Sequence, residues 1–137
     1  MTLTREQEDA WLAALLDGEG HFNLQRRASY THISIRIVQC LCDELLEKIK
    51  GVTGFGTVDP GFQWRIDNRE GVQAFLDRTE PYLIVKKEEA SLVRAIVSTF
   101  ARQGYHPKPE ALILREKLMV LWENRPRSRK ARKEGKE

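Results

Sequence analysis

The segment that most constrains the fold is a short apolar run that ends in glycine and acid. Residues 12–16 read Leu-Ala-Ala-Leu-Leu, and residues 17–20 read Asp-Gly-Glu-Gly. The apolar run predicts a helix, and glycine is a common residue just past a helix end. The carboxylate of Glu19 is therefore expected where the backbone must turn. An acid at a rigid helix end suits a hard cation such as Mg²⁺.

The start and one face of this helix can also be predicted. Thr4 can cap the helix, and Gln7 follows three residues later as its capping-box partner. Ala10, Ala14 and Gly18 are spaced four residues apart, so they share one face. This stripe of small residues would let another backbone approach closely, which makes it a candidate interface.

Two stretches after this helix alternate apolar and polar residues with a period of two. Residues 21–27 and 30–39 predict the strands of a hairpin with one packed side and one wet side. A second hairpin is expected at 56–58 and 62–66, across a turn at 59–61. The residues expected to face inward are Phe22, Leu24, Ile33, Ile35, Ile37, Trp64 and Ile66.

Further helices are predicted at 43–52, after the capping residue Asn68, at 86–103 and at 110–124, with Gly104 ending the third of these. The resulting order is αββαββα with one added helix, an α+β fold. We expect one domain over residues 1–124 and a basic, flexible tail over 125–137, because the tail holds seven basic residues and two acids.

The outward residues of the two hairpins are types that read base edges. Arginine pairs with guanine, asparagine and glutamine pair with adenine, and a β-ribbon fits the major groove. A solvated sheet face would carry similar residues, but there is no acid between Glu19 and Asp43. The candidate DNA-binding residues are Asn23, Gln25, Arg26, Arg27, Tyr30, His32, Ser34, Arg36, Gln63, Arg65 and Asp67.

Composition excludes several other classes. The 137 residues carry a net charge of +3 and no apolar run near the ~20 residues of a membrane span. The first residues lack the apolar stretch of a signal peptide, so a soluble intracellular protein with no membrane partner is expected. Cys40 and Cys42 have no second pair to complete a zinc site, and we interpret them as reduced packing residues.

The segment Leu12–Gly20 resembles the nonapeptide motif of the LAGLIDADG homing endonucleases. Later segments resemble the same family in the same order: 54–58, 64–66, 72–76 and 81–90, the last reading Pro-Tyr-Leu-Ile-Val-Lys-Lys-Glu-Glu-Ala. The resemblance implies a curved antiparallel sheet that forms a DNA-binding saddle backed by helices.

The resemblance also implies roles for particular residues. Glu19 matches the metal-binding acid, and the Gly18 carbonyl matches a second metal contact, with Mg²⁺ as cofactor. Gln39 matches a polar residue that positions water, and Lys86 matches a basic residue near the scissile phosphate, with Lys87 as a rival. Asp17 is expected to be structural rather than a ligand.

One motif helix supplies one acid, whereas cutting two strands needs two. A homodimer through the first helix is therefore expected, with a pseudo-palindromic double-stranded DNA site and a staggered double-strand break. The alternative is a non-cleaving binder of the same fold, either a maturase-like RNA-binding protein or a DNA-binding regulator. The presence of Glu19 and Lys86 favours cutting, because a binder needs neither. A third alternative is an α+β dimer without nucleic acid.

Overall fold

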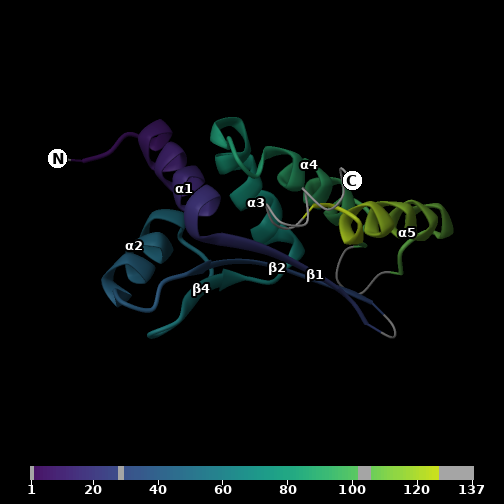
Figure 1. The fold of residues 1–137 in the computed structure, drawn as a ribbon, viewed down its shortest axis with the longest axis horizontal. Helices are drawn as coiled ribbons and strands as arrows, with labels where there is room; N and C mark the ends of the chain where they lie inside the picture. The colour runs from purple at the N-terminus through teal and green to yellow at the C-terminus, as the bar shows by residue number, and fades with distance from the viewer. Residues whose placement is uncertain (1, 28–29, 102–105, 127–137) are drawn as a thin grey trace.

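The computed structural model describes residues 2–27, 30–101 and 106–126 (Figure 1). The elements are α1 (Arg5–Glu19), β1 (Gly20–Arg26), β2 (Thr31–Val38), α2 (Asp43–Thr53), β3 (Thr57–Asp59), β4 (Gln63–Ile66), α3 (Arg69–Thr79), the 3₁₀ turn η1 (Glu80–Tyr82), α4 (Lys87–Val97) and α5 (Pro109–Glu123). Their order confirms the predicted αββαββα core, which α4 and the extra C-terminal helix α5 follow.

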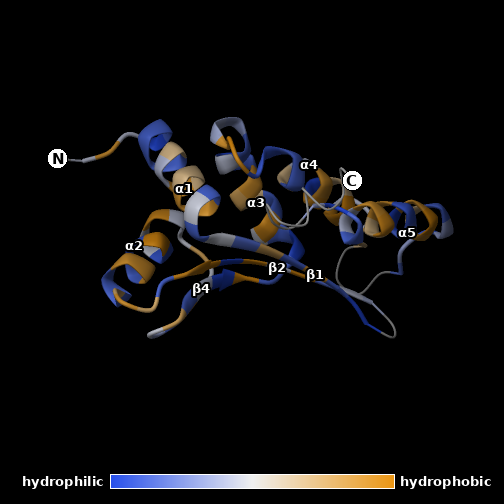
Figure 2. Ribbon diagram, viewed as in Figure 1, coloured by the Kyte–Doolittle hydropathy of each residue, from blue (hydrophilic) through white to orange (hydrophobic). Residues whose placement is uncertain are grey.

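The four strands form one antiparallel sheet in the order β1-β2-β4-β3. Helices α1, α3 and α4 lie on one side of this sheet, and no labelled helix covers the other side (Figure 1). Hydrophobic residues run along β2 and over the helices above it (Figure 2). The sheet therefore has one packed face and one open face, as the alternation predicts.

The core forms where the inward strand residues meet the helices. All seven predicted inward residues are buried, together with Leu12 and Leu16 of α1. The ring of Trp64 lies 5.1 Å from that of Phe75, and its indole nitrogen donates to the Phe55 carbonyl at 3.1 Å. Burial of each large apolar side chain contributes about 1.5–3 kcal/mol.

Helix α1 is capped at the predicted residues and is also anchored by Arg78, a contact that was not predicted. The Gln7 N–H donates to the Thr4 hydroxyl at 3.1 Å, and the Thr4 N–H donates to the Gln7 side chain at 2.9 Å, which completes the capping box. Arg78 of α3, only 7% exposed, binds Asp9 at 2.6 Å and the Val52 carbonyl at 3.0 Å. These contacts fix α1 against both α2 and α3.

One helix is shorter than predicted. Helix α4 ends at Val97. Just after it, the hydroxyls of Ser98 and Thr99 donate to the Ala95 and Ile96 carbonyls at 2.6 Å each, and such side-chain bonds compete with continuation of the helix. Gly104, the predicted end, lies outside the described residues. Residues 127–137, most of the predicted tail, also lie outside them. Within the described ranges no helix is long and apolar enough to cross a membrane.

The prediction that the two cysteines are packed is wrong. Cys40 and Cys42 are free thiols, as predicted, but both are exposed rather than packed. They lie in the connection between β2 and α2, beyond the last paired residue of the strand. The alternating pattern that buries the β2 side chains does not extend to them.

Candidate functional site

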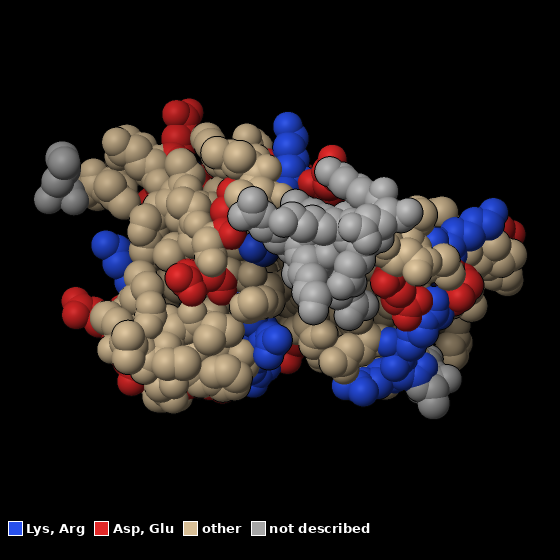
Figure 3. Space-filling model, in the orientation of Figure 1, with Lys and Arg blue, Asp and Glu red and all other residues tan. Residues whose placement is uncertain are grey.

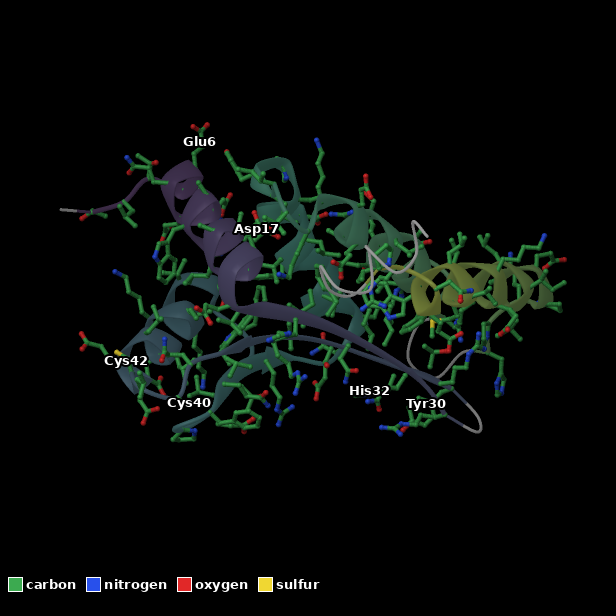
Figure 4. All side chains as sticks on the ribbon, in the orientation of Figure 1. Glu6, Asp17, Tyr30, His32, Cys40 and Cys42 are labelled. Atoms are coloured by element: carbon green, nitrogen blue, oxygen red, sulfur yellow. The ribbon has the colours of Figure 1, made fainter. Side chains whose placement is uncertain are left out.

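The open face of the sheet gathers most of the predicted base-reading residues. Residues opposite each other in an antiparallel pair project to the same side. The register pairs Asn23 with Ser34, Gln25 with His32, and Arg36 with Arg65, and so builds one polar face. His21 pairs with Arg36 and so belongs to the same face. The prediction from sequence left it out, although its alternation with the inward residue Phe22 indicates an outward position. His32 and Tyr30 lie on the side away from the helices (Figure 4).

Two members of this face are more buried than expected. Ser34 is 4% exposed and Gln63 is 6% exposed, because both lie on inner strands and longer neighbours cover them. Among the described residues, Gln63 Oε1 and Arg36 Nε are buried without a hydrogen-bond partner. Unpaired buried polar atoms are costly, so this face has donor and acceptor capacity to offer a polar ligand.

Arg65 is held between two carboxylates. Its Nε donates to Asp59 at 3.1 Å, and its Nη1 donates to Asp67 at 2.7 Å. Hydrogen bonds from Gln63 and then from Arg65 lower the pKa of Asp59 below its ordinary value. Two carboxylates, those of Asp59 and Asp67, therefore lie at this face, and their hydrogen bonds fix the orientation of the Arg65 guanidinium.

Arg26 lies on the other side of the sheet. It pairs with Thr31 in the register and alternates with Gln25, so it projects toward the helices. There it makes hydrogen-bonded ion pairs with Glu123 and Glu116 of α5, which raise the pKa of Arg26 above its ordinary value. Opposite charges gather beside α5 in Figure 3. The prediction that Arg26 belongs to the DNA-binding surface is therefore wrong, whereas the next residue, Arg27, is exposed and stays a candidate.

The second part of the site is the C-terminal end of α1. Glu19 is the last residue of this helix, and its exposed carboxylate makes no hydrogen bond or ion pair with any described residue. The helix has no basic residue in its last turn. Its end therefore combines a free carboxylate with the partial negative charge of unpaired backbone carbonyls. This combination attracts cations.

Lys86 reaches the same helix end from far along the chain. Its Nζ donates to the Asp17 carbonyl oxygen at 2.9 Å, although the two residues are 69 positions apart. The Asp17 carboxylate accepts the backbone N–H groups of Ile84 at 2.8 Å and Lys86 at 2.9 Å. Asp17 lies on the side of α1 toward α3 (Figure 4). The Asp17 side chain thus joins α1 to the segment before α4, and the rival Lys87 lies exposed in the first turn of α4.

Gln39 follows the end of β2. Its backbone N–H donates to the Phe62 carbonyl at 2.9 Å, and its side-chain oxygen accepts the Leu41 N–H at 2.9 Å. These bonds shape the turn after β2. The side-chain amide nitrogen has no described partner, so it keeps both protons for another acceptor.

The described residues of one chain do not form a metal site by themselves. The described residues include no cluster of three or more His, Cys, Asp or Glu that could hold a metal ion. Glu19 and the Gly18 carbonyl suit Mg²⁺ as oxygen ligands, but they need further ligands from elsewhere. The stripe of Ala10, Ala14 and Gly18 is exposed, and a Cβ added at Gly18 would meet nothing within 4 Å. A second copy of the chain could therefore approach this helix end.

Comparison with solved structures shows the fold. The homing endonuclease I-CvuI, in complex with the I-CreI target in the presence of Mg, aligns with a TM-score of 0.70 and 24% identity over 90% of this chain and 87% of that chain. The homing endonuclease I-TnaI aligns with a TM-score of 0.64 and 23% identity over 90% and 98%. At these identities the likeness establishes the LAGLIDADG homing-endonuclease fold.

A third structure differs in length. The LAGLIDADG meganuclease I-AabMI, bound to uncleaved DNA, aligns with a TM-score of 0.68 and 20% identity over 80% of this chain but 43% of that chain. No family model matches the sequence, and no curated protein matches it either. The present chain thus covers nearly all of I-TnaI and less than half of I-AabMI.

Proposed function

We propose that this protein is a site-specific DNA endonuclease that acts as a homodimer. It makes a metal-dependent, staggered double-strand break in a long pseudo-palindromic site. The observation that carries the proposal is that the Lys86 ammonium binds the Asp17 carbonyl in the last turn of α1, the helix that ends at the exposed Glu19. This end adjoins β1, the first strand of the sheet that bears the base-reading residues.

The dimer follows from the count of acids and from the length of the chain. Each copy supplies one exposed carboxylate at the C-terminal end of α1, that of Glu19, whereas a cut in both strands needs two. The chain also covers 43% of I-AabMI, so two copies correspond to one such protein. Pairing through the exposed stripe of Ala10, Ala14 and Gly18 brings two Glu19 side chains toward one axis. Two-fold symmetry in the protein then requires a pseudo-palindromic site.

Each group at the helix end has a defined task. Glu19 and the Gly18 carbonyl hold Mg²⁺, which when bound activates water and stabilises the leaving oxygen. Lys86 places a positive charge near the phosphate and offsets the charge that develops in the transition state. The Gln39 amide donates to and orients a water molecule. None of these residues reads bases.

Base reading is the task of the open sheet face. Arg36 and Arg65 offer guanidinium groups to guanine, while Asn23 and Gln25 offer amides to adenine. Because Asp59 and Asp67 hold Arg65 from two sides, its direction is set before DNA binds. Such preorganisation reduces the entropy lost when a flexible side chain is fixed on binding.

The test separates cutting from binding. Wild-type protein is incubated with a library of randomised pseudo-palindromic duplexes and Mg²⁺, and the cut ends are sequenced. Glu19→Gln should abolish cleavage of the selected duplex but retain its binding in the absence of metal. Glu47→Gln, an exposed acid on α2, is the matched control and should cut normally.

Two results would contradict this proposal in different ways. Undiminished cleavage by Glu19→Gln would remove Glu19 from the metal site. Tight, sequence-specific binding by the wild-type protein without any cleavage would instead identify a non-cleaving binder of the same fold.

A further inference from the structure

The segment that carries Lys86 has few contacts of its own. Leu83 is buried, but the next two side chains, Ile84 and Val85, are 84% and 66% exposed. Packing therefore anchors only the start of this segment. The bonds that hold its remainder against α1 come from Asp17.

Three hydrogen bonds join Asp17 to this segment. One carboxylate oxygen accepts the Ile84 N–H at 2.8 Å, and the other accepts the Lys86 N–H at 2.9 Å. The Lys86 ammonium then returns to the Asp17 backbone carbonyl at 2.9 Å. This carbonyl belongs to the last turn of α1, where backbone oxygens lack a partner within the helix. Both the main chain and the side chain of Lys86 are thus tied to one residue.

The charges of this contact suit both helix ends. Lys86 stands against the C-terminal end of α1, which has no basic residue in its own last turn. Asp17 stands against the N-terminal end of α4, whose capping residue Lys86 makes no side-chain cap. A cation at the first end and an anion at the second are each favourable with the helix dipole. The contact therefore has an electrostatic basis as well as hydrogen bonds.

We infer that Asp17 is a positioning residue that holds the Lys86 ammonium at the C-terminal end of α1 before DNA arrives. This inference rests on the proposed endonuclease function, and it assigns to Asp17 a task separate from metal binding. Lys87, the next residue, makes no such contact with the described residues and is exposed in the first turn of α4. The choice between the two lysines is thus made by Asp17.

The first experiment is a double-mutant cycle in single-turnover cleavage at saturating protein. Asp17→Asn keeps the size of the side chain but removes its charge and one acceptor. We expect it to slow cleavage on the order of 10-fold or more, because misplacing a reacting group has effects of this size. DNA affinity measured without metal should change by less than about 2-fold, since the residue acts through Lys86 rather than through binding.

Coupling decides whether Asp17 acts through Lys86. In a Lys86→Met background, Asp17→Asn should slow cleavage by no further factor, because the group it positions is already absent. Lys87→Met is the matched control and should cut at the wild-type rate. An equal loss from Asp17→Asn with and without Lys86 would overturn the inference.

A second experiment does not depend on cleavage. Lysines are labelled with an amine-reactive acylating reagent, and Lys86 and Lys87 are compared by mass spectrometry. Lys86 should be protected relative to Lys87 in the wild-type protein and lose that protection in Asp17→Asn. Equal labelling of Lys86 in both proteins would overturn the inference, whereas a wild-type protein that never cuts DNA would refute only the proposed function.

A third variant covers the case in which Asp17→Asn fails to fold. Ile84→Pro removes the N–H that bonds to Asp17 without altering α1, and the exposed Ile84 side chain has little packing to lose. Leu83 has φ −70° and ψ 143°, a conformation that suits a residue before proline. Ile84→Pro should raise the labelling of Lys86 above the wild-type level. Unchanged labelling would contradict the inference that the hydrogen bonds of Asp17 hold Lys86 in place.

Discussion

Gly20 is a position at which a small substitution should have a clear effect on the fold. This glycine ends α1 and begins β1, and its N–H donates to the Leu16 carbonyl. A Cβ placed on it would lie 2.6 Å from the Leu16 oxygen and 2.8 Å from the Leu16 Cα. Both are backbone atoms of the helix, which cannot move aside as a flexible side chain can. Gly20→Ala should therefore push β1 away from α1.

The size of the effect follows from these distances. Carbon atoms pack best at about 3.5–4.0 Å, so relief of the overlap needs a backbone shift of roughly 1 Å. Overpacking of this kind costs about 1–3 kcal/mol of unfolding free energy. This is a large part of the total stability of an ordinary domain, which is about 5–15 kcal/mol.

Gly51→Ala is the matched control. Gly51 lies exposed within α2, and a Cβ added there would meet nothing within 4 Å. Alanine favours the helix over glycine by about 0.8–1.0 kcal/mol, so this variant should be more stable than the wild type. Urea unfolding at equal protein concentration measures both. If Gly20→Ala proves as stable as Gly51→Ala, the close approach of β1 to the end of α1 is refuted.

Other variants test the interface, the sheet face and the tail. Ala14→Leu should overpack the proposed helix contact at a cost of about 1–3 kcal/mol and shift the protein toward monomer in sedimentation; a wild type that is already monomeric at micromolar concentration would contradict the dimer. Arg65→Ala should cost about 1–3 kcal/mol at one base position in duplex titrations, whereas deletion of 127–137 should weaken all duplexes alike and reduce the salt dependence; the reverse pattern would place base reading in the tail. Because its hydrogen bonds lower the pKa of Asp59, the stability this residue contributes is present above its ordinary pKa of about 3.9 and is lost as pH falls through the lower folded value. Asp59→Asn should remove that loss from urea-unfolding curves recorded between about pH 2 and 6, and an unchanged acid limb would show that the bonds contribute nothing.

Local patterns predicted the elements and their inward sides. The Thr4–Gln7 capping box and the Asn68 cap depend only on residues three positions apart, and both form as expected. The strand residues that face the core were also correct, because a strand turns its side chains to alternate sides whatever its partners are. The same alternation shows His21 on the open face and Arg26 on the packed face, so their placement was available from the pattern.

What the tertiary structure alone decided depends on contacts between distant segments. The resemblance favoured Lys86 with Lys87 as a rival, and in the structure only Lys86 has hydrogen bonds to Asp17 among the described residues. Asp67 lies two residues from Arg65 on the same side of the chain, but Asp59 reaches Arg65 only because β3 pairs with β4. Periodicity records the geometry of one helix or strand, so the sequence by itself determined the α+β order and the acid at the end of α1. The neighbours of each charged group follow from packing, and so the bonds between Lys86 and Asp17 were known only from the folded chain.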